Sequence, residues 1–203
     1  MTQLAVEAPP APEARERILR AAERLFAEKG YAATAVHEIT DAAAVNRALL
    51  YYYFADKQSL YQGVIEAGVD EFARMLERAL STPGPYAERL AALVRGHLDL
   101  LLRRRHLARV MHRCLLDGHK REMEPEDRLD RTIGRLEAFL REGVAVGELR
   151  PCNPAILART LLGPTYVFSL WELFEGMRFT PEETARQITE MLLHGLSAHP
   201  SSG

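Results

Sequence analysis

Apolar residues recur every three or four positions along almost all of this 203-residue chain. This spacing is typical of amphipathic helices, and no stretch alternates apolar with polar residues as a half-buried strand would. Proline, glycine or a residue suited to cap a helix separates each periodic stretch from the next. The sequence therefore predicts an all-α protein of about nine helices, which must pack together to bury their apolar faces.

The N-terminal part of the chain predicts three short helices followed by a long one. The first should span about residues 13–29 and end at Gly30. The second should begin at Thr34 and the third just after Asn46, because both side chains are good helix N-caps. A fourth helix, from Asp56 to about Leu80, is long enough to join a small head to a separate body.

The chain should divide into three parts. Residues 1–12 are rich in Ala and Pro and predict a flexible arm, residues 13–57 a helix-turn-helix head, and residues 58–203 a helical body. Within the body, Pro and Gly interrupt the helical pattern repeatedly. Its further helices are expected at about residues 86–104, 106–116, 129–144, 154–175 and 181–197.

The segment Arg47–Lys57 places an arginine, three tyrosines and a lysine in the third helix and just after it. Two short helices in tandem, the second bearing Arg and Tyr, are typical of a domain that recognises a DNA groove. Arg47 can pair bidentately with guanine, and Tyr51 can contact a thymine methyl group or a phosphate. In the alternative interpretation the tyrosines are core aromatics. The expected DNA-contacting residues are Thr34, Asn46, Arg47, Ala48, Tyr51, Tyr52, Tyr53 and Lys57.

Three segments of the head resemble the tetracycline-repressor (TetR) family of bacterial one-component regulators. They are residues 17–31 (RILRAAERLFAEKGY), 34–39 (TAVHEI) and 50–57 (LYYYFADK). The resemblance covers about the first quarter of the chain, and the rest agrees with the family in helical pattern and length. It implies phosphate contacts from Tyr52 and Tyr53 and a two-fold dimer formed by the body.

Two features of the head depart from a simple DNA-binding surface. The family usually has Gly in the turn between the two helices, whereas this chain has Ala44. A Cβ atom in a left-handed conformation costs on the order of 1 kcal/mol, so we expect a mildly strained or reshaped turn. In addition, residues 13–57 carry seven positive and seven negative side chains. Non-specific DNA affinity should therefore be weak, and specificity should depend on individual contacts.

The predicted helix at 154–175 is apolar almost all round, so it must be covered on two sides. One side can face its own bundle, and a second subunit best explains the other, although a deeply buried helix in a monomer would have the same pattern. The last helix adds small residues that permit close approach. The expected dimer contacts are Leu161, Val167, Leu170, Phe174, Ile188, Leu192 and Gly195.

A mainly apolar pocket is expected between the helices of the body. Its candidate residues, each of which could instead be plain core, are His97, Met111, Cys114, Phe139, Tyr166, Phe168 and Trp171. They favour an apolar or aromatic ligand. Phe72, Met75 and Leu76 of the long helix should touch the pocket. The resemblance implies that a ligand displaces this helix and spoils the spacing of two recognition helices, which must lie about 34–36 Å apart.

Other chemistries find little support. The spacing of His106, His112, Cys114 and His119 matches no compact set of metal ligands. The chain has no nucleophile–base set, phosphate loop or metal motif, so we expect neither an enzyme nor a cofactor. Two cysteines suit a reducing cytosol, and no segment resembles a signal peptide or membrane span. The expected location is the cytoplasm, with no membrane partner.

The sequence thus favours a ligand-responsive, DNA-binding transcriptional regulator. Most simply it is a repressor, a homodimer on a pseudo-palindromic double-stranded operator, released by a small apolar or aromatic effector. The alternative is a helical-bundle carrier of small molecules, or a structural dimer, that never touches DNA. The segment Arg47–Lys57 distinguishes them, because the alternative does not need it.

Overall fold

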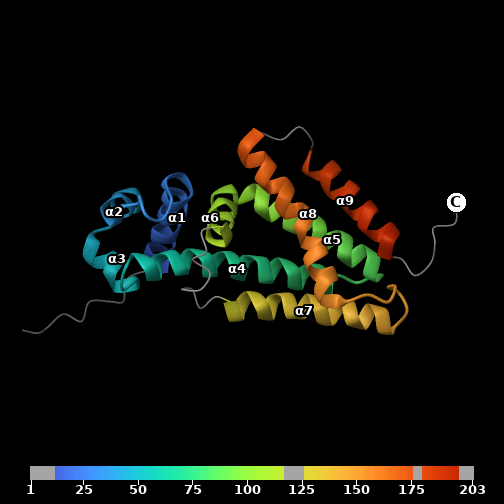
Figure 1. The fold of residues 1–203 in the computed structure, drawn as a ribbon. Helices are drawn as coiled ribbons and strands as arrows, with labels where there is room; N and C mark the ends of the chain where they lie inside the picture. The colour runs from blue at the N-terminus through green and yellow to red at the C-terminus, as the bar shows by residue number, and fades with distance from the viewer. Residues whose placement is uncertain (1–11, 117–125, 176–179, 197–203) are drawn as a thin grey trace, which may run out of the picture. The chain divides into compact units, whose positions relative to one another are not determined.

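The computed structural model describes residues 12–116, 126–175 and 180–196, with side chains described for 13–114, 128–171, 180 and 182–192. These residues form nine helices and no β-strand, which confirms the predicted all-α fold (Figure 1). The helices are α1 (Pro12–Lys29), α2 (Val36–Ala43), α3 (Arg47–Tyr53), α4 (Lys57–Ser81), α5 (Tyr86–Arg103), α6 (Arg105–Leu116), α7 (Glu126–Ala145), α8 (Pro154–Glu175) and α9 (Pro181–Leu196). Residues 1–11 of the predicted arm lie outside the described part. None of the described helices is long and apolar enough to cross a membrane.

The chain forms two compact units, which divide between Ile65 and Glu66. The first unit therefore continues beyond the expected boundary at residue 57 and includes the first two turns of α4. Tyr61 explains the extension, because its ring meets the buried Phe26 ring edge-on at 5.1 Å. The side chains that fill this small core are Ile18, Ala22, Phe26, Ile39, Leu50, Phe54, Leu60 and Val64.

The cap of α2 differs from the sequence prediction. Thr34 is buried, and its hydroxyl donates to the backbone carbonyls of Leu25 (3.2 Å) and Gly30 (2.7 Å). It therefore does not cap α2, and the prediction that it does was wrong. The N-cap is Ala35, whose N–H donates to the Glu38 carboxylate at 2.9 Å. The hydrogen bond from Lys29, followed by that from Ala35, holds the pKa of Glu38 below its usual range.

The turn between α2 and α3 keeps the left-handed conformation that glycine usually supplies. Ala44 has φ 52° and ψ 51°, the only positive φ of a non-glycine residue within the described part of the chain. Two backbone hydrogen bonds close the end of α2, from Ala44 to Asp41 (3.2 Å) and from Val45 to Thr40 (3.0 Å). The expected turn is thus strained, not reshaped, because these two bonds end the helix in the usual Schellman pattern.

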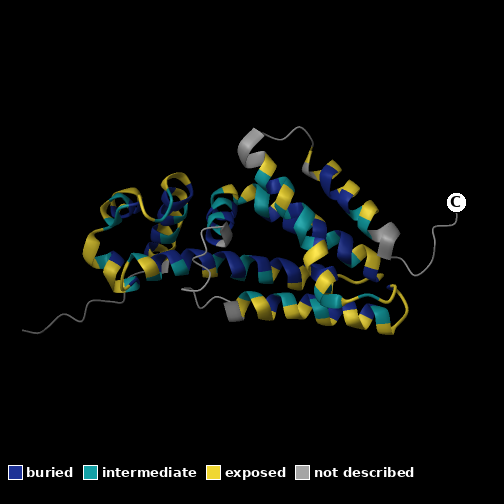
Figure 2. Cartoon of the chain, in the orientation of Figure 1, coloured by how far each residue is buried: buried dark blue, intermediate teal, exposed yellow. Residues whose placement is uncertain are grey.

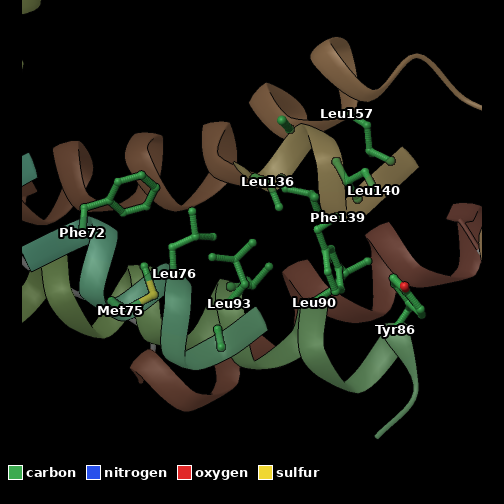
Figure 3. Packing of buried hydrophobic residues seen from close by; sticks show 14 of the residues in the cluster. Phe72, Met75, Leu76, Tyr86, Leu90, Leu93, Leu136, Phe139, Leu140 and Leu157 are labelled. Atoms are coloured by element: carbon green, nitrogen blue, oxygen red, sulfur yellow. The ribbon is translucent and has the colours of Figure 1, made fainter. Parts of the chain in front are cut away.

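The second unit is a bundle around the core cluster drawn in Figure 3. Residues 66–81 of α4 lie beside α7, and two ion pairs join these helices, Asp70–Arg128 and Glu77–Arg135 (Figure 1). α5 packs against α8 and α9. The fully buried leucines of the cluster include Leu76, Leu90, Leu93, Leu136, Leu140 and Leu161, one or more from each of α4, α5, α7 and α8.

Candidate nucleic-acid interface and ligand cavity

The third helix presents its functional side chains on the outside of the head. Asn46 caps it as predicted, because the side-chain oxygen accepts a hydrogen bond from the N–H of Leu49 at 2.7 Å. Leu50 is fully buried, whereas Arg47 and Ala48 are exposed. The helix, with sequence RALLYYY, has no acidic residue that would repel a phosphate.

The tyrosines of α3 are not plain core aromatics. Tyr51 is 40% exposed and Tyr52 63% exposed, although both are large and partly apolar. Tyr53 is half-buried and meets the ring of Tyr52 edge-on at 5.1 Å. The Arg47 guanidinium lies 5.5 Å from the centre of the Tyr51 ring and 3.4 Å from its hydroxyl. Arginine and tyrosine therefore share one outer face of α3.

The two remaining candidates in the head have other contacts. Lys57 donates to the backbone carbonyl of Ala32 at 3.3 Å, and its ammonium lies 4.5 Å from the centre of the Tyr31 ring. The hydroxyl of Thr34 points into the core, so it is not offered to solvent. The exposed candidates on α3 are thus Arg47, Ala48, Tyr51 and Tyr52.

The second unit encloses a cavity of about 320 Å³, at the small end of the usual range for ligand pockets. It lies among five helices of the body, from α4 to α8. Most of the lining is apolar. The lining residues are Gly68, Val69, Phe72, His97, Leu100, Leu101, Arg104, Leu107, Ala108, Met111, Leu129, Ile133, Arg159, Leu162, Gly163 and Tyr166.

Part of the lining of this cavity was predicted from the sequence. Three of the predicted residues line it: His97, Met111 and Tyr166. Phe72 also lines it, as expected of the long helix, while Met75 and Leu76 belong to the neighbouring core.

Four predicted pocket residues lie elsewhere. Cys114 is buried but is not part of the lining, and Phe139 packs in the core against the ring of Tyr86 at 4.6 Å. Phe168 borders a separate hollow with residues of α9. Trp171 is 59% exposed. The spacing of apolar residues did not distinguish the sides of the helices that face the cavity, the core and solvent, because apolar residues occur on all of these sides.

Two buried histidines hydrogen-bond to hydroxyl groups one turn apart on α8. His97 Nδ1 lies 2.7 Å from the Thr165 hydroxyl, and His112 Nε2 lies 3.4 Å from the Ser169 hydroxyl. Burial lowers the pKa of each histidine to about 4, so both are neutral at pH 7. Burial likewise raises the pKa of Tyr166 to about 12.

The hydroxyl groups determine which ring nitrogen carries the proton. Thr165 donates its own proton to the carbonyl of Leu162 at 2.7 Å, and Ser169 donates to the carbonyl of Tyr166 at 2.8 Å. Each hydroxyl must then accept from its histidine, which makes His97 Nδ1 and His112 Nε2 the protonated nitrogens. The second nitrogen of each ring is left as an acceptor.

The two charged residues among the lining are both arginines. Arg104 forms an ion pair with Glu71 of α4, and Arg159 forms one with Glu137 of α7 at 3.2 Å. Neither carboxylate is among the lining residues. These arginines were not predicted from the sequence, although His97, Leu100, Leu101 and Arg104 follow the i, i+3, i+4, i+7 spacing of one helix face.

The predicted dimer residues separate into two groups. Leu161 and Ile188 are buried within the core of their own unit, so they are not available to a partner, because each helix turns these side chains inward. Val167 is 45% exposed, and Leu170 and Leu192 are half-buried. The side chains of Phe174 and Gly195 lie outside the described residues. Exposed apolar residues on the same helices are Ile156, Trp171 and Met191. Figure 2 shows exposed positions along both α8 and α9.

Comparisons with known proteins agree with this architecture. A family profile described as "Bacterial regulatory proteins, tetR family" matches residues 18–64. A second, "Tetracyclin repressor-like, C-terminal domain", matches residues 83–196, more than half of the chain.

Similar proteins include other transcriptional regulators, one of them of known structure. The transcriptional regulator AcuR of Cereibacter sphaeroides is 34% identical over 153 residues, 70% of this chain and 68% of that protein. The structure of PfmR, a TetR family transcriptional regulator from Thermus thermophilus, is 28% identical, covers 88% of this chain and 97% of that one, and has a TM-score of 0.72.

A third similar structure is that of AibR in complex with isovaleryl coenzyme A and operator DNA. It is 26% identical, covers 88% of this chain and 97% of the AibR chain, and has a TM-score of 0.71. The helix-turn-helix head, the helical body and both profile matches lead to one conclusion: the chain belongs to the tetR family of bacterial regulatory proteins.

Proposed function

We propose that this protein is a ligand-responsive repressor that occupies a pseudo-palindromic operator and leaves it when a small effector fills the cavity of the body. One observation carries the proposal. The same chain has an exposed α3 face of arginine and tyrosine and, in its other unit, an apolar cavity bordered by the helix that begins in the head. A carrier of small molecules would need only the cavity, and a structural dimer would need neither feature.

DNA recognition is assigned to α3. Arg47 stands in its first turn, where side chains of a recognition helix reach base edges, and a guanidinium can bond to two acceptors of guanine. Tyr51 and Tyr52 are exposed and carry hydroxyls suited to phosphate. Asn46 fixes the start of the helix, and Lys57 adds a positive charge near it.

The effector is assigned to the cavity. Its lining is mostly aliphatic and aromatic, which favours a small ligand with an apolar body. Phe72 belongs to α4, so a ligand that presses on this side chain also acts on the helix that continues from the head. AibR, whose structure contains both isovaleryl coenzyme A and operator DNA, is consistent with such an arrangement.

A homodimer is assigned to α8 and α9. Ile156, Val167 and Trp171 share one exposed face of α8, and Met191 is exposed on α9. Large apolar side chains grouped in this way are typical of an interface. A two-fold dimer would also place two recognition helices on successive major grooves of a pseudo-palindromic site.

The test is footprinting of the purified protein on the DNA upstream of its own gene, followed by affinity measurements on the protected site. Arg47→Ala should weaken binding to this site by about 1–3 kcal/mol and relax base preference at one position per half-site. Lys57→Ala is the matched control, because a lysine contact to phosphate should weaken binding to all sequences alike.

Equal, sequence-independent losses in both variants would contradict the role of Arg47. The absence of any protected site would favour the carrier or structural dimer. A reporter under the protected promoter decides the direction of regulation, since a repressor lowers its expression and an activator raises it.

A further inference from the structure

Polar and apolar residues follow a definite order along the side of α5 that lines the cavity. His97, Leu100, Leu101 and the C-cap residue Arg104 all line the cavity at i, i+3, i+4, i+7 spacing. At about 1.5 Å per residue, the two polar residues stand about 10 Å apart along the helix axis. The cavity therefore presents a histidine, then two leucines, then a guanidinium along one line.

The histidine end of this wall accepts hydrogen bonds and cannot hold an anion. His97 uses Nδ1 to donate to Thr165, which leaves Nε2 as an unprotonated acceptor. The hydrogen bonds among the described residues leave Nε2 without a partner. Because burial keeps the ring neutral, it attracts a hydroxyl or amide N–H and repels a carboxylate oxygen.

The guanidinium end has the opposite preference. The side chain of Arg104 is about two-thirds buried, with 34% of it exposed, and its partner Glu71 is not among the lining residues. A guanidinium has five N–H donors, so it can hold a ligand anion beside or in place of Glu71. Arg159, the second lining arginine, is 64% exposed and adds positive charge at another part of the wall.

We propose that the effector of this cavity is an elongated organic anion with an apolar middle and a hydroxyl or amide N–H about 10 Å from its charge. Arg104 holds the anionic group in competition with Glu71, Leu100 and Leu101 contact the apolar middle, and His97 Nε2 accepts the hydrogen bond. This inference rests on the proposed function, whose effector it specifies. A fatty acid with a hydroxyl group far from its carboxylate has this chemistry.

Isothermal titration calorimetry on the full-length protein without DNA tests the ligand class. The probes are 10-hydroxydecanoate, decanoate, 1,10-decanediol and decanoyl coenzyme A. We expect 10-hydroxydecanoate to bind about tenfold more tightly than the diol, because a charge-assisted hydrogen bond replaces a neutral one. Weaker binding of decanoyl coenzyme A than of 10-hydroxydecanoate supports the proposed arrangement, and tighter binding overturns it, because the acyl chain of the thioester does not lie between its amide N–H groups and its phosphates.

Substitutions in the ion pair separate recognition from mere structural support. Arg104→Gln should abolish the preference for the anionic probes, whereas Glu71→Gln should increase it, because the competing carboxylate is removed. A purely structural pair would give the same loss in both variants. Arg135→Gln is the matched control, since it breaks the Glu77–Arg135 pair between α4 and α7, whose residues do not line the cavity. It should leave all affinities unchanged.

The histidine is tested by His97→Phe, which keeps an aromatic ring but removes the acceptor. It should erase the advantage of 10-hydroxydecanoate over decanoate. Equal binding of the diol and the anions, or no binding of any anionic probe, overturns the proposal.

Operator binding is measured in parallel by fluorescence anisotropy. Anion binding without any operator binding would then overturn the proposed repressor and leave the ligand assignment standing.

Discussion

The two units of this protein bury their polar side chains in different ways. In the head, Thr34 satisfies its hydroxyl with the carbonyls of Leu25 and Gly30, at most nine residues away. In the body, His97 and His112 reach hydroxyls on α8 that are 68 and 57 residues distant in sequence. The buried Thr34 hydroxyl of the head therefore depends on local sequence, whereas the two buried histidines of the body depend on how distant helices pack.

The same difference separates their functional surfaces. The candidate DNA contacts of the head lie on one short helix and face outward. The cavity of the body is enclosed by parts of α4, α5, α6, α7 and α8. An outward-facing site on one helix can be recognised from a motif, but an internal site on five helices requires the packing to be known.

The largest expected effect tests whether the body has distinct inner and outer faces on α8. Leu161 is fully buried, so Leu161→Asp places an unpaired carboxylate in the core and should cost several kcal/mol, enough to unfold the body. Trp171 is 59% exposed, so Trp171→Asp should preserve the helix content while dissociating the proposed dimer. Circular dichroism and sedimentation velocity measure these two effects. Equal unfolding by both substitutions would show that Trp171 is part of the core.

A second prediction concerns acid stability of the body. The folded-state pKa of each buried histidine is lowered to about 4, against an ordinary value of 6.5. The unfolded chain thus binds more protons, so the stability is complete above about pH 6.5 and is lost as the pH falls toward 4. The loss should be on the order of 3 kcal/mol for His97 and smaller for His112.

Urea unfolding between pH 4 and 7 measures this dependence. His97→Phe should flatten it, because the phenyl ring has no proton to bind. His106→Gln is the control, since His106 belongs to neither buried pair. An unchanged pH slope in His97→Phe would mean that the histidine is not the group that titrates.

The smallest expected effect lies in the head and tests whether its local turn is strained. Ala44 has φ 52°, a conformation that glycine adopts without steric cost. Ala44→Gly should stabilise the head by about 0.5–1 kcal/mol, since the relief of strain exceeds the extra entropy of glycine in the unfolded chain. Urea unfolding followed by the fluorescence of the head tyrosines would reveal it, and a destabilised variant would show that the turn is not strained.

Much of the fold followed from the sequence because helix ends are local features. Gly30, Asn46 and Asp56 mark boundaries that the structure confirms. Asp56 caps α4, because its carboxylate accepts a hydrogen bond from the N–H of Ser59 at 2.7 Å. Thr34 was misassigned because its hydroxyl donates to the carbonyls of Leu25 and Gly30, at the end of α1. A preference for helix N-caps does not reveal these two acceptors.

The cavity was less predictable for a physical reason. α8 is apolar on nearly every side, so hydrophobic periodicity cannot tell which side faces the cavity, the core or solvent. Leu161 and Trp171 were therefore assigned to the wrong surroundings. Arg104 and Arg159 were overlooked because a charged residue near a helix end usually lies in solvent.

The two hydroxyl groups on α8 have a consequence for how this helix is fixed about its own axis. Apolar packing is non-directional, so a helix that is apolar all round could rotate at little cost. Thr165 and Ser169 stand one turn apart, and each must meet a ring nitrogen of a different helix. A rotation by one residue, about 100°, would break both hydrogen bonds together and leave the N–H groups of two buried histidines unpaired. These two bonds thus fix the rotation of α8, the most hydrophobic of the described helices, about its own axis.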